Sequence, residues 1–548
     1  MENVKNVKSY IKNVPQYFLI IATLLSVFGV FYYTIGLSKN FVNTDIFDTL
    51  LWAKASYESG KIISPDFYYS AFLPFGGSLL MLPFIPFFGV SFTTHVIGMV
   101  IFEIIFLVCF VLFFRKIGFN ANWIMIALIA NCLLWLCSDK FREMFMEHII
   151  YYSLSALFVL VGYMLINEFV CSINSASKRK KIILGLISVA FFTLVATDGV
   201  QIVGLATVPV IAAFICERFF DVKTRITSKE NRPTIVAVVI VGIATVAGLI
   251  VIKMLLHGSV SEYASSFSQY DTNDRIYMYP QKIKNFVDCW YQLFEVFFIS
   301  KVSLSSINQI PILVTAAYAT ILLLTVPITA LFYKKIKAQE VKKLFWIALF
   351  VNAITLFLWI VGTIAGVEWR LIPSVFASFL LLITELKMMF ETVELKRFSI
   401  VIIAVVLLTA YPSFNYLIAY SPTDNYAGYS ALLEKMEHNN ITHGYGNYWI
   451  SGTLNVLTQE KVNIEFVEFH TDEQLHIYQY QQFPHIDEDN SFDNTVLILQ
   501  TKATDFYEQT DSYKNNKERL LEKYEMGGEF GYVAYFYDYD IYGSIVNP

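Results

Sequence analysis

Charged residues are scarce in this sequence. Asp, Glu, Lys and Arg make up 16% of its 548 residues, whereas soluble globular proteins carry roughly 25%. Hydrophobic residues make up 56% and aromatic residues 16%, and the mean hydropathy is +0.53. This balance fits poorly with a soluble enzyme, a disordered chain or a nucleic-acid binder. The class that remains is a polytopic membrane protein.

Several motifs of well-known chemistry are also missing. There is no G-x-x-x-x-G-K-[ST] and no G-x-G-x-x-G, which argues against an ATP-driven pump. Neither H-E-x-x-H nor G-x-S-x-G occurs, so metalloprotease and serine-hydrolase chemistry have no support. The six cysteines lack C-x-x-C spacing and are expected to be small buried hydrophobes. Histidines in the C-terminal region lack metal-ligand spacing, so we predict no metal site there.

Long apolar runs are what the sequence has in abundance. A bilayer-spanning helix needs about 20 mostly apolar residues. Eleven runs meet or approach this length: 17–36, 96–114, 123–138, 149–169, 182–197, 199–216, 234–253, 311–332, 344–363, 371–386 and 398–419. The first run follows Lys5, Lys8 and Lys12 and has no A-x-A-like cleavage site, which indicates an uncleaved anchor.

Lysine and arginine gather in every second loop between these eleven runs, so that the basic loops all fall on the same side of the membrane. Examples are the segments 178–181, 217–232 and 334–343. By the positive-inside rule these loops face the cytoplasm. We therefore expect a multi-pass protein of the cell membrane with a cytoplasmic N-terminus and an extracytoplasmic C-terminus.

The loops expected on the outer side include two long ones, 37–95 and 254–310. Long loops are where function tends to concentrate. Within the first, residues 77–89 are apolar but too short to span a membrane, and Pro83 and Pro86 interrupt them. This segment is expected to be an interfacial or re-entrant element.

The acidic composition of the C-terminal region indicates a soluble domain. We predict a transmembrane domain over 1–419 and an extracytoplasmic α/β domain over 420–548. The expected strands are Val462–Phe469, Thr495–Leu499 and Tyr532–Tyr537, and the charged stretch 513–525 is expected to be a helix.

Ionisable residues at the edges of apolar runs are the candidates for function, since burying a charge in a membrane is costly. Asp45 and Asp48 follow the first run. If their segment is helical, the two side chains share a face. The alternative is that an aspartate here only caps a short helix.

A second group lies between the third and fourth runs and comprises Arg142, Glu143, Glu147 and His148. Two carboxylates, an arginine and a histidine at a helix mouth suit sugar or phosphate binding. Local ion pairs at a solvated helix start are the alternative, and His148 could be a buried histidine bonded to a carbonyl group.

Two further groups complete the set. Asp198 and Gln201 join the fifth and sixth runs, where the alternative is a tight Asp-Gly turn. Arg370 begins the tenth run and could hold a phosphate with two hydrogen bonds. Its alternative is a snorkelling arginine beside the interfacial Trp369.

The arrangement resembles the GT-C superfamily of membrane glycosyltransferases, particularly its bacterial protein-mannosyltransferase and aminoarabinose-transferase-like members. One helix precedes a long outer loop that opens with an acidic residue. The segments that carry the resemblance are Asp45 with Leu51–Ala55 and Pro74–Leu80, then Arg142–Leu154, Asp198–Gln201, Trp369–Pro373 and Gly444–Thr458.

The resemblance implies a GT-C-like fold of about 11 transmembrane helices and transfer of a sugar from a polyprenyl-phosphate donor, with inversion. The acceptor would be an envelope glycan, lipid or protein. The family's first-loop base maps to Asp45, and its second-site acid maps to Glu143 or Glu147. This chain has Thr44-Asp45 where the mannosyltransferase branch has Asp-Glu, which leaves the acceptor class open. Whether the enzyme uses a divalent metal is also left open.

Two other functions compete with this one. A transporter or flippase of envelope precursors would show two related halves with broken helices at mid-membrane, and no such halves are seen. A non-catalytic envelope scaffold would work through its C-terminal domain. In all three cases the bilayer is a partner and nucleic acid is not.

Overall fold

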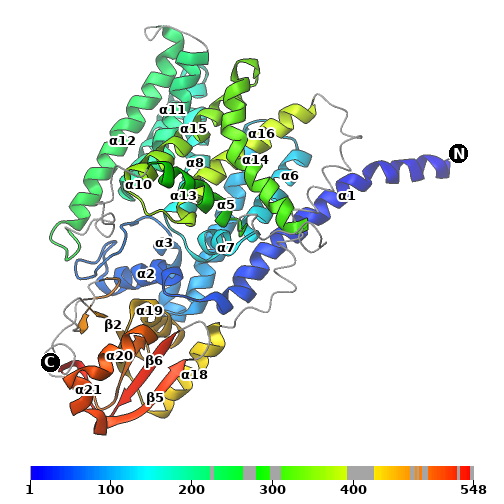
Figure 1. Ribbon diagram of the computed structural model, residues 1–548. Coiled ribbons are helices and arrows are strands. Elements are labelled where there is room, and N and C mark those ends of the chain that lie inside the picture. Colours follow the sequence, from blue (N-terminus) through cyan, green and yellow to red (C-terminus); the bar gives the residue numbers. More distant parts are fainter. Residues whose placement is uncertain are drawn as a thin grey trace. The chain divides into compact units, whose positions relative to one another are not determined.

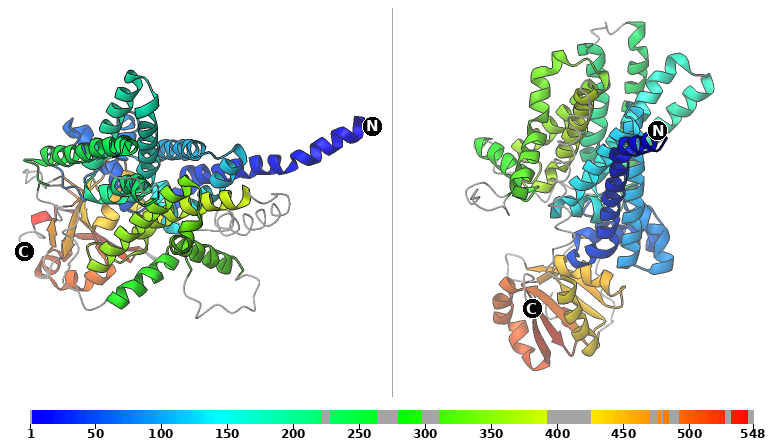
Figure 2. Two further views of the ribbon diagram at one scale, coloured as in Figure 1. Left: turned by 90° about the horizontal axis from the view of Figure 1, so that it is seen from above. Right: turned by 90° about the vertical axis from the view of Figure 1, so that its right-hand side faces the viewer.

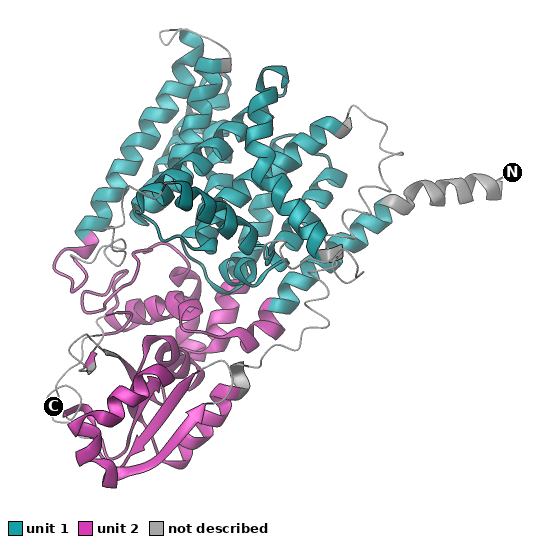
Figure 3. Ribbon diagram, viewed as in Figure 1, with its two compact units in different colours: residues 1–33, 101–254, 267–420 teal, residues 34–100, 255–266, 421–548 magenta. Residues whose placement is uncertain are grey.

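The computed structural model describes residues 2–221, 228–262, 279–296, 310–391, 425–469, 475–477, 480–483, 492–526 and 531–543. The chain divides into two compact units, coloured separately in Figure 3. Unit 1 comprises residues 1–33, 101–254 and 267–420, and unit 2 comprises residues 34–100, 255–266 and 421–548. Each unit is therefore assembled from segments far apart in the sequence.

Unit 1 is a bundle of long helices, seen from three directions in Figures 1 and 2. Helix α5 (Phe92–Lys116) belongs mostly to this unit. The others are α1 (Glu2–Tyr32), α6 (Ala121–Leu136), α7 (Asp139–Arg142), α8 (Tyr151–Ser175), α9 (Lys178–Thr197), α10 (Val200–Ile202), α11 (Val208–Cys216), α12 (Arg232–Leu256), α13 (Tyr279–Gln292), α14 (Ile310–Phe332), α15 (Gln339–Val361) and α16 (Ile372–Glu391). Short 3-10 and π-helical turns connect several of them, including η5 (Glu143–Glu147), η6 (Val203–Thr207) and η12 (Glu368–Leu371).

Within the described residues, nine helices are long and apolar enough to cross a membrane. A tenth is reached if α6 and the Asp139–Glu147 segment, bent by 111°, count as one broken span. Ten of the eleven apolar runs in the sequence coincide with these elements. The eleventh, 398–419, lies outside the described residues.

Close helix contact in unit 1 depends on small residues. A Cβ atom on Gly248 of α12 would lie 2.2 Å from the carbonyl oxygen of Thr193 on α9. Only glycine allows the two backbones to approach this closely, as is usual between membrane helices. Aromatic side chains fill the remaining core, where Trp135 packs on Phe145 with ring centroids 4.9 Å apart.

Unit 2 combines the first long loop with the C-terminal region. The loop forms η3 (Asp45–Phe47), α2 (Asp48–Ser59), α3 (Ser78–Met81) and α4 (Ile85–Phe88). Residues Ser78–Phe88 form a short apolar helical segment below spanning length, as the sequence predicts for 77–89. Helix α2 ends at Gly60, whose φ of 65° is the left-handed conformation that glycine adopts readily.

The C-terminal region builds a six-stranded mixed sheet in the order β3-β2-β1-β4-β6-β5. Its strands are β1 (His443–Gly446), β2 (Asn463–Phe469), β3 (Leu475–Ile477), β4 (Thr495–Gln500), β5 (Leu520–Met526) and β6 (Tyr532–Tyr537). Strand β1 pairs in parallel with β2 and β4, and the other pairings are antiparallel. The predicted α/β character and three predicted strands are thus confirmed.

Helices cover both faces of this sheet (Figure 1). On one face, Tyr445, Leu497 and Tyr535 pack with Tyr507 of α20 (Thr501–Gln509) and Tyr513 of α21 (Asp511–Asn515). On the other face α19 (Tyr448–Leu457) packs on β1 and β2. Helix α18 (Asn425–His438) packs against β5.

The predicted helix over 513–525 is wrong. Helix α21 ends at Asn515, and Leu520–Met526 form strand β5, paired antiparallel with β6. The alternating exposure along β5 is that of an edge strand with one buried face. Its frequent charges favour a helix locally, but pairing with the fully buried β6 decides the conformation.

We predict that Gly444→Ala loosens the sheet. A Cβ atom there would lie 2.5 Å from Cγ1 and 2.6 Å from the carbonyl oxygen of Val496 on the neighbouring strand. Because backbone atoms cannot move aside without disturbing the strand pairing, the free energy of unfolding of the sheet should fall by about 1–3 kcal/mol. Faster hydrogen exchange of β4 and β6 amides in the purified full chain would register the loss. Gly543→Ala, where a Cβ meets nothing within 4 Å, is the control; equal exchange in both variants would contradict the prediction.

Candidate functional site

Asp45 and Asp48 stand at the start of the first long loop's helical segment. Asn43 starts it, since its Oδ1 accepts a hydrogen bond from the Ile46 amide at 3.2 Å. Phe47 anchors it, with its ring packed edge-on against His95 at 5.1 Å between centroids. Neither η3 nor α2 has a side-chain cap hydrogen bond. The capping alternative for the aspartates therefore does not describe this segment.

A tyrosine from the C-terminal region contacts both aspartates. The Tyr448 hydroxyl lies 2.8 Å from Oδ1 of Asp45 and 2.9 Å from Oδ1 of Asp48. Tyr448 is the first residue of α19, and a single residue, the N-cap Asn447, separates it from strand β1. All three residues belong to unit 2. The side chains of Asp45 and Asp48 thus share a face, as their spacing predicts, and one hydroxyl group joins them.

Gln481 supports the same cluster from a second point of the C-terminal region. Its Oε1 accepts a hydrogen bond from the Trp52 indole at 2.7 Å, and its Nε2 donates to Ser70 Oγ at 2.5 Å. Gln481 and Ser70 also hydrogen-bond the carboxyl group of Asp48. The backbone amide of Gln481 donates to the Tyr68 carbonyl at 2.6 Å. Hydrogen bonds around Asp48 therefore join the first loop to the C-terminal region.

Burial controls the ionisation of this cluster. Asp48 is 6% exposed, and loss of water together with the nearby charge of Asp45 raises its pKa well above the usual value. Burial and the same two carboxylates raise the pKa of Tyr448 well above that of a free tyrosine. Near neutral pH Tyr448 therefore keeps its proton, and Asp48 is the harder of the two acids to ionise.

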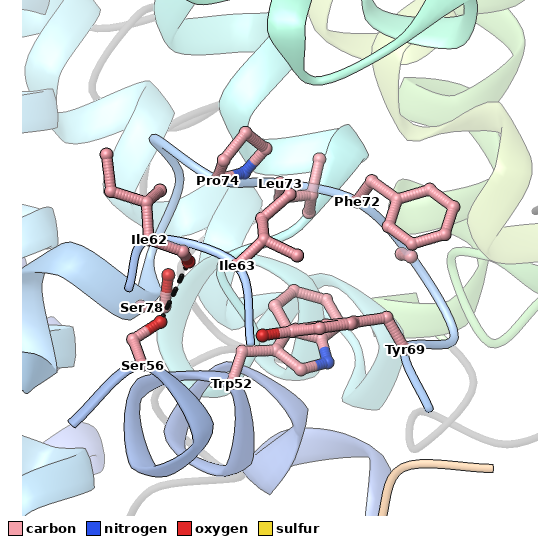
Figure 4. Close-up of a pocket in the computed structure, with 10 residues that line it drawn as sticks. Trp52, Ser56, Ile62, Ile63, Tyr69, Phe72, Leu73, Pro74 and Ser78 are labelled. Atoms are coloured by element: carbon pink, nitrogen blue, oxygen red, sulfur yellow. Dashed lines mark hydrogen bonds between the residues drawn. The ribbon is translucent and has the colours of Figure 1, made fainter. Parts of the chain in front are cut away.

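A small, largely apolar cavity lies beside α2, on the side of this helix that carries Trp52 and Ser56 (Figure 4). It measures about 240 Å³ when its open mouth is included. Trp52, one helical turn after Asp48, lines it together with Tyr69, Ile63 and Leu73. Ser56 at its edge donates to the Ile62 carbonyl at 2.9 Å.

The remaining candidates lie in unit 1, and Arg142 is the most deeply buried of them. Its side chain is 1% exposed. It forms an ion pair with Asp139, donates to the Leu136 carbonyl at 2.8 Å and lies 3.8 Å from Glu295. Its guanidinium also faces the Tyr33 ring at 5.8 Å. These contacts hold together α7 and its neighbours, which fits the local ion-pair alternative.

Glu143 and Glu147 have different partners. Glu143 forms an ion pair with Lys140 at 2.6 Å. Glu147 is 2% exposed and accepts a hydrogen bond from the Tyr33 hydroxyl. The next residue, His148, is extended and 4% exposed. Of the two glutamates, only Glu147 is buried from water.

The segments around the second and fourth candidate groups contact each other in unit 1. Lys140 Nζ lies 4.9 Å from the centre of the Trp369 ring, and the Arg370 guanidinium lies 5.6 Å from that of Tyr152. The third group lies at the junction of α9 and α10, and α10 packs against α8, the helix of Tyr152. Asp198 there is 2% exposed, and Gly199 has a φ of 92°, so the tight Asp-Gly turn is real.

The structure thus joins Asp45 with Asp48 in unit 2, and places Arg142, Glu143, Glu147, His148, Asp198, Gln201 and Arg370 in unit 1. Sequence reasoning missed Tyr448, Gln481 and Tyr33, which bond the candidate carboxyl groups. Tyr448 lies within the family-like segment Gly444–Thr458, and this was its only signal. Among the described residues, no group of three or more His, Cys, Asp or Glu side chains could hold a metal ion.

Comparison with known proteins adds one finding. The sequence matches no protein-family model and no curated protein sequence. The structure resembles the crystal structure of ArnT from Cupriavidus metallidurans bound to undecaprenyl phosphate, with a TM-score of 0.51 and 10% sequence identity. The match covers 96% of this chain and 99% of ArnT. The fold is GT-C-like. The apo structure of the same ArnT matches with a TM-score of 0.44 and 11% identity.

The GT-C-like fold and the apolar helices together make this chain a multi-pass membrane protein. The fold class expected from the sequence is therefore confirmed, including the C-terminal domain with its sheet. At this identity the likeness speaks for the fold alone.

We predict that Arg142→Met lowers stability. The substitution removes the charge-assisted bond to Asp139 and leaves the Leu136 carbonyl without its donor, at a cost of about 1–3 kcal/mol. The midpoint of thermal unfolding of the detergent-purified chain should fall. Arg519→Met removes an ion pair with Asp538 that is about half exposed, and should cost under about 1 kcal/mol. If the two variants unfold at the same midpoint temperature, the structural role of Arg142 is refuted.

Proposed function

We propose that this protein is an inverting membrane glycosyltransferase that moves a sugar from a polyprenyl-phosphate donor to an acceptor hydroxyl on the outer face of the membrane. The observation that carries the proposal is the Asp45–Tyr448–Asp48 cluster, which joins the first long loop of a GT-C-like chain to its C-terminal region. ArnT, the similar structure, binds undecaprenyl phosphate, which supports a donor of this lipid class.

The reaction asks for one base and one fixed positive charge. The acceptor oxygen attacks the anomeric carbon, its proton passes to Asp45, and the bond from that carbon to the phosphate oxygen breaks. The polyprenyl phosphate leaves with the bonding electrons. Because phosphate is already a good leaving group, no general acid is needed. A carboxylate about 3 Å from the acceptor hydroxyl suffices as base.

Arg370 is the arginine we assign to the departing phosphate. Arg142 is held by Asp139 and the Leu136 carbonyl, which occupy both of its terminal nitrogens. Arg370 is half-buried in η12, the turn that precedes α16, with its guanidinium over Tyr152. A planar guanidinium suits two phosphate oxygens at once, and a fixed cation stabilises charge developing in the transition state.

The other polar residues are proposed to bind substrate. Buried Glu147, beside His148, is better placed than Glu143 to meet a sugar hydroxyl, because Glu143 is engaged by Lys140. Asp198 and Gln201 are proposed to act with them. In this proposal the N-terminus is cytoplasmic and the C-terminal domain lies outside, which the basic short loops support.

Asp45→Asn should lower the transfer rate by about 10²–10⁴-fold, the usual contribution of a general base. The assay offers the purified chain radiolabelled polyprenyl-phosphate sugars with envelope extract as the acceptor, and measures label leaving the lipid. Asp66→Asn, an exposed aspartate in the same loop, is the matched control and should keep wild-type turnover. Equal turnover in Asp45→Asn and wild type would refute the base. Lipid translocation into proteoliposomes without covalent transfer would favour the flippase.

Arg370→Gln should lower kcat by about 10²–10³-fold, as expected when a donor to developing negative charge is removed. Arg370→Lys should recover only part of the rate, because an ammonium group cannot make two parallel bonds to phosphate. Arg519→Gln, which changes an exposed arginine, serves as the control. Steady-state kinetics with varied donor lipid separate kcat from KM. An unchanged kcat in Arg370→Gln would remove Arg370 from the reaction.

A further inference from the structure

One hydroxyl group lies between two carboxyl oxygens in unit 2. The Tyr448 oxygen is 2.8 Å from Asp45 Oδ1 and 2.9 Å from Asp48 Oδ1, and both distances are ordinary for O–H···O hydrogen bonds. A phenol has one hydrogen, so it can donate to only one of the two carboxyl groups. The second contact is a hydrogen bond only if the other carboxyl group carries a hydrogen and donates it to the phenol oxygen.

The surroundings show which aspartate carries that hydrogen. Asp48 is 6% exposed, whereas Asp45 is half-buried. Burial disfavours the charged form of the more enclosed acid. Two carboxylates this close also repel each other if both are ionised. Asp48 is therefore the protonated partner, and Tyr448 directs its own hydrogen to Asp45.

Other titratable groups lie on the elements that pack against the cluster. On α2, Lys54 is paired with Glu460 and Glu58. From the C-terminal region, Tyr480 packs edge-on against Tyr448 at 4.9 Å, and Gln481 contributes a neutral amide. From α5, His95 contacts Phe47. The apolar segment Ser78–Phe88, which packs on α2, has no ionisable side chain.

Helix α19 is fixed against the aspartates' segment by close packing. A Cβ atom on Gly452 would lie 2.4 Å from Cγ2 of Thr44, the residue before Asp45. One residue further along α19, the Thr453 amide donates to Thr44 Oγ1 at 3.3 Å. The hydroxyl of Tyr448, at the first residue of this helix, is thus held in place by contacts that do not involve the carboxyl groups.

We propose that Tyr448 is a positioning residue supplied by the C-terminal domain, and that its hydroxyl donates to Asp45 while accepting a hydrogen bond from protonated Asp48. This rests on the proposed function, in which Asp45 is the base. Asp45 stays ionised, and the hydrogen bond from Tyr448 fixes the carboxylate that takes the acceptor's proton. The pair then carries one proton before the reaction and two after it, and the added proton leaves to water with the product. The C-terminal domain is in this way part of the catalytic apparatus.

Tyr448→Phe tests the proposal in the full-length enzyme. The variant keeps the ring contacts with Phe466 and Tyr480 but loses the hydroxyl. We expect kcat to fall about 10-fold or more, with KM for the donor lipid within about twofold. A hydrogen bond donated to a carboxylate lowers its pKa, so its loss should raise the pKa of Asp45 and shift the acidic limb of the kcat profile to higher pH.

Tyr445→Phe is the matched control. It removes another buried tyrosine hydroxyl of the same domain, one that donates to Asp540 at 3.1 Å. It should keep the wild-type kcat and pH profile. If Tyr448→Phe also behaves as wild type while Asp45→Asn is inactive, the role of Tyr448 is refuted and the transferase assignment survives. If Asp45→Asn is active, the transferase assignment itself fails.

Two variants of Asp48 keep the test decisive even if Tyr448→Phe unfolds. In Asp48→Asn the amide can still donate to the Tyr448 oxygen, whereas in Asp48→Leu nothing can. We expect Asp48→Asn to retain at least 10-fold more kcat than Asp48→Leu at equal thermal stability. Equal losses in the two variants would overturn the assignment of the shared proton.

Discussion

The hydrogen bonds of a single tyrosine hydroxyl hold the structure's candidate base. Two ionised aspartates one helical turn apart repel each other, and a buried charge without partners is costly. Tyr448 resolves both problems by giving one hydrogen to Asp45 and taking one from Asp48. Gln481 and Ser70 also hydrogen-bond the carboxyl group of Asp48. The first long loop depends on this arrangement, because α2 begins at Asp48 and presents Trp52 to Gln481.

The buried polar residues of unit 1 are paired in a similar way. Arg142 is almost fully buried but has two acidic neighbours and a carbonyl group, and Glu147 has the Tyr33 hydroxyl. Lys140 is shared between Glu143 and the Trp369 ring. Such pairing makes ionisable residues tolerable next to apolar helices. It also separates structural residues from those proposed to meet substrate. Both terminal nitrogens of Arg142 are hydrogen-bonded within the protein, and we therefore assign the phosphate role to Arg370.

The sequence predicts the long helices well, because about 20 apolar residues have few other stable states. It also predicts that Asp45 and Asp48 share a face, since this follows from a spacing of three on one helix. Tyr448 could not be found in the same way, because its partners lie 400 and 403 positions earlier in the chain and only the folded unit brings them together. Strand β1, with the sequence His-Gly-Tyr-Gly, was missed because glycine weakens a strand signal. Here the glycines are required for close contact with Val496 and Ser451. The stretch Leu520–Met526 was misassigned because its charges favour a helix, and only β6 reveals it as a strand.

The shared proton is the central claim, and infrared spectroscopy of the purified full-length protein tests it most directly. At neutral pH, the wild-type-minus-Asp48→Asn difference spectrum should contain the carbonyl stretch of one protonated carboxyl group. In a Tyr448→Phe background the same difference should move in frequency, because the acid then loses the phenol oxygen as its acceptor. A difference spectrum with only carboxylate bands would show that Asp48 is ionised, and would contradict the account.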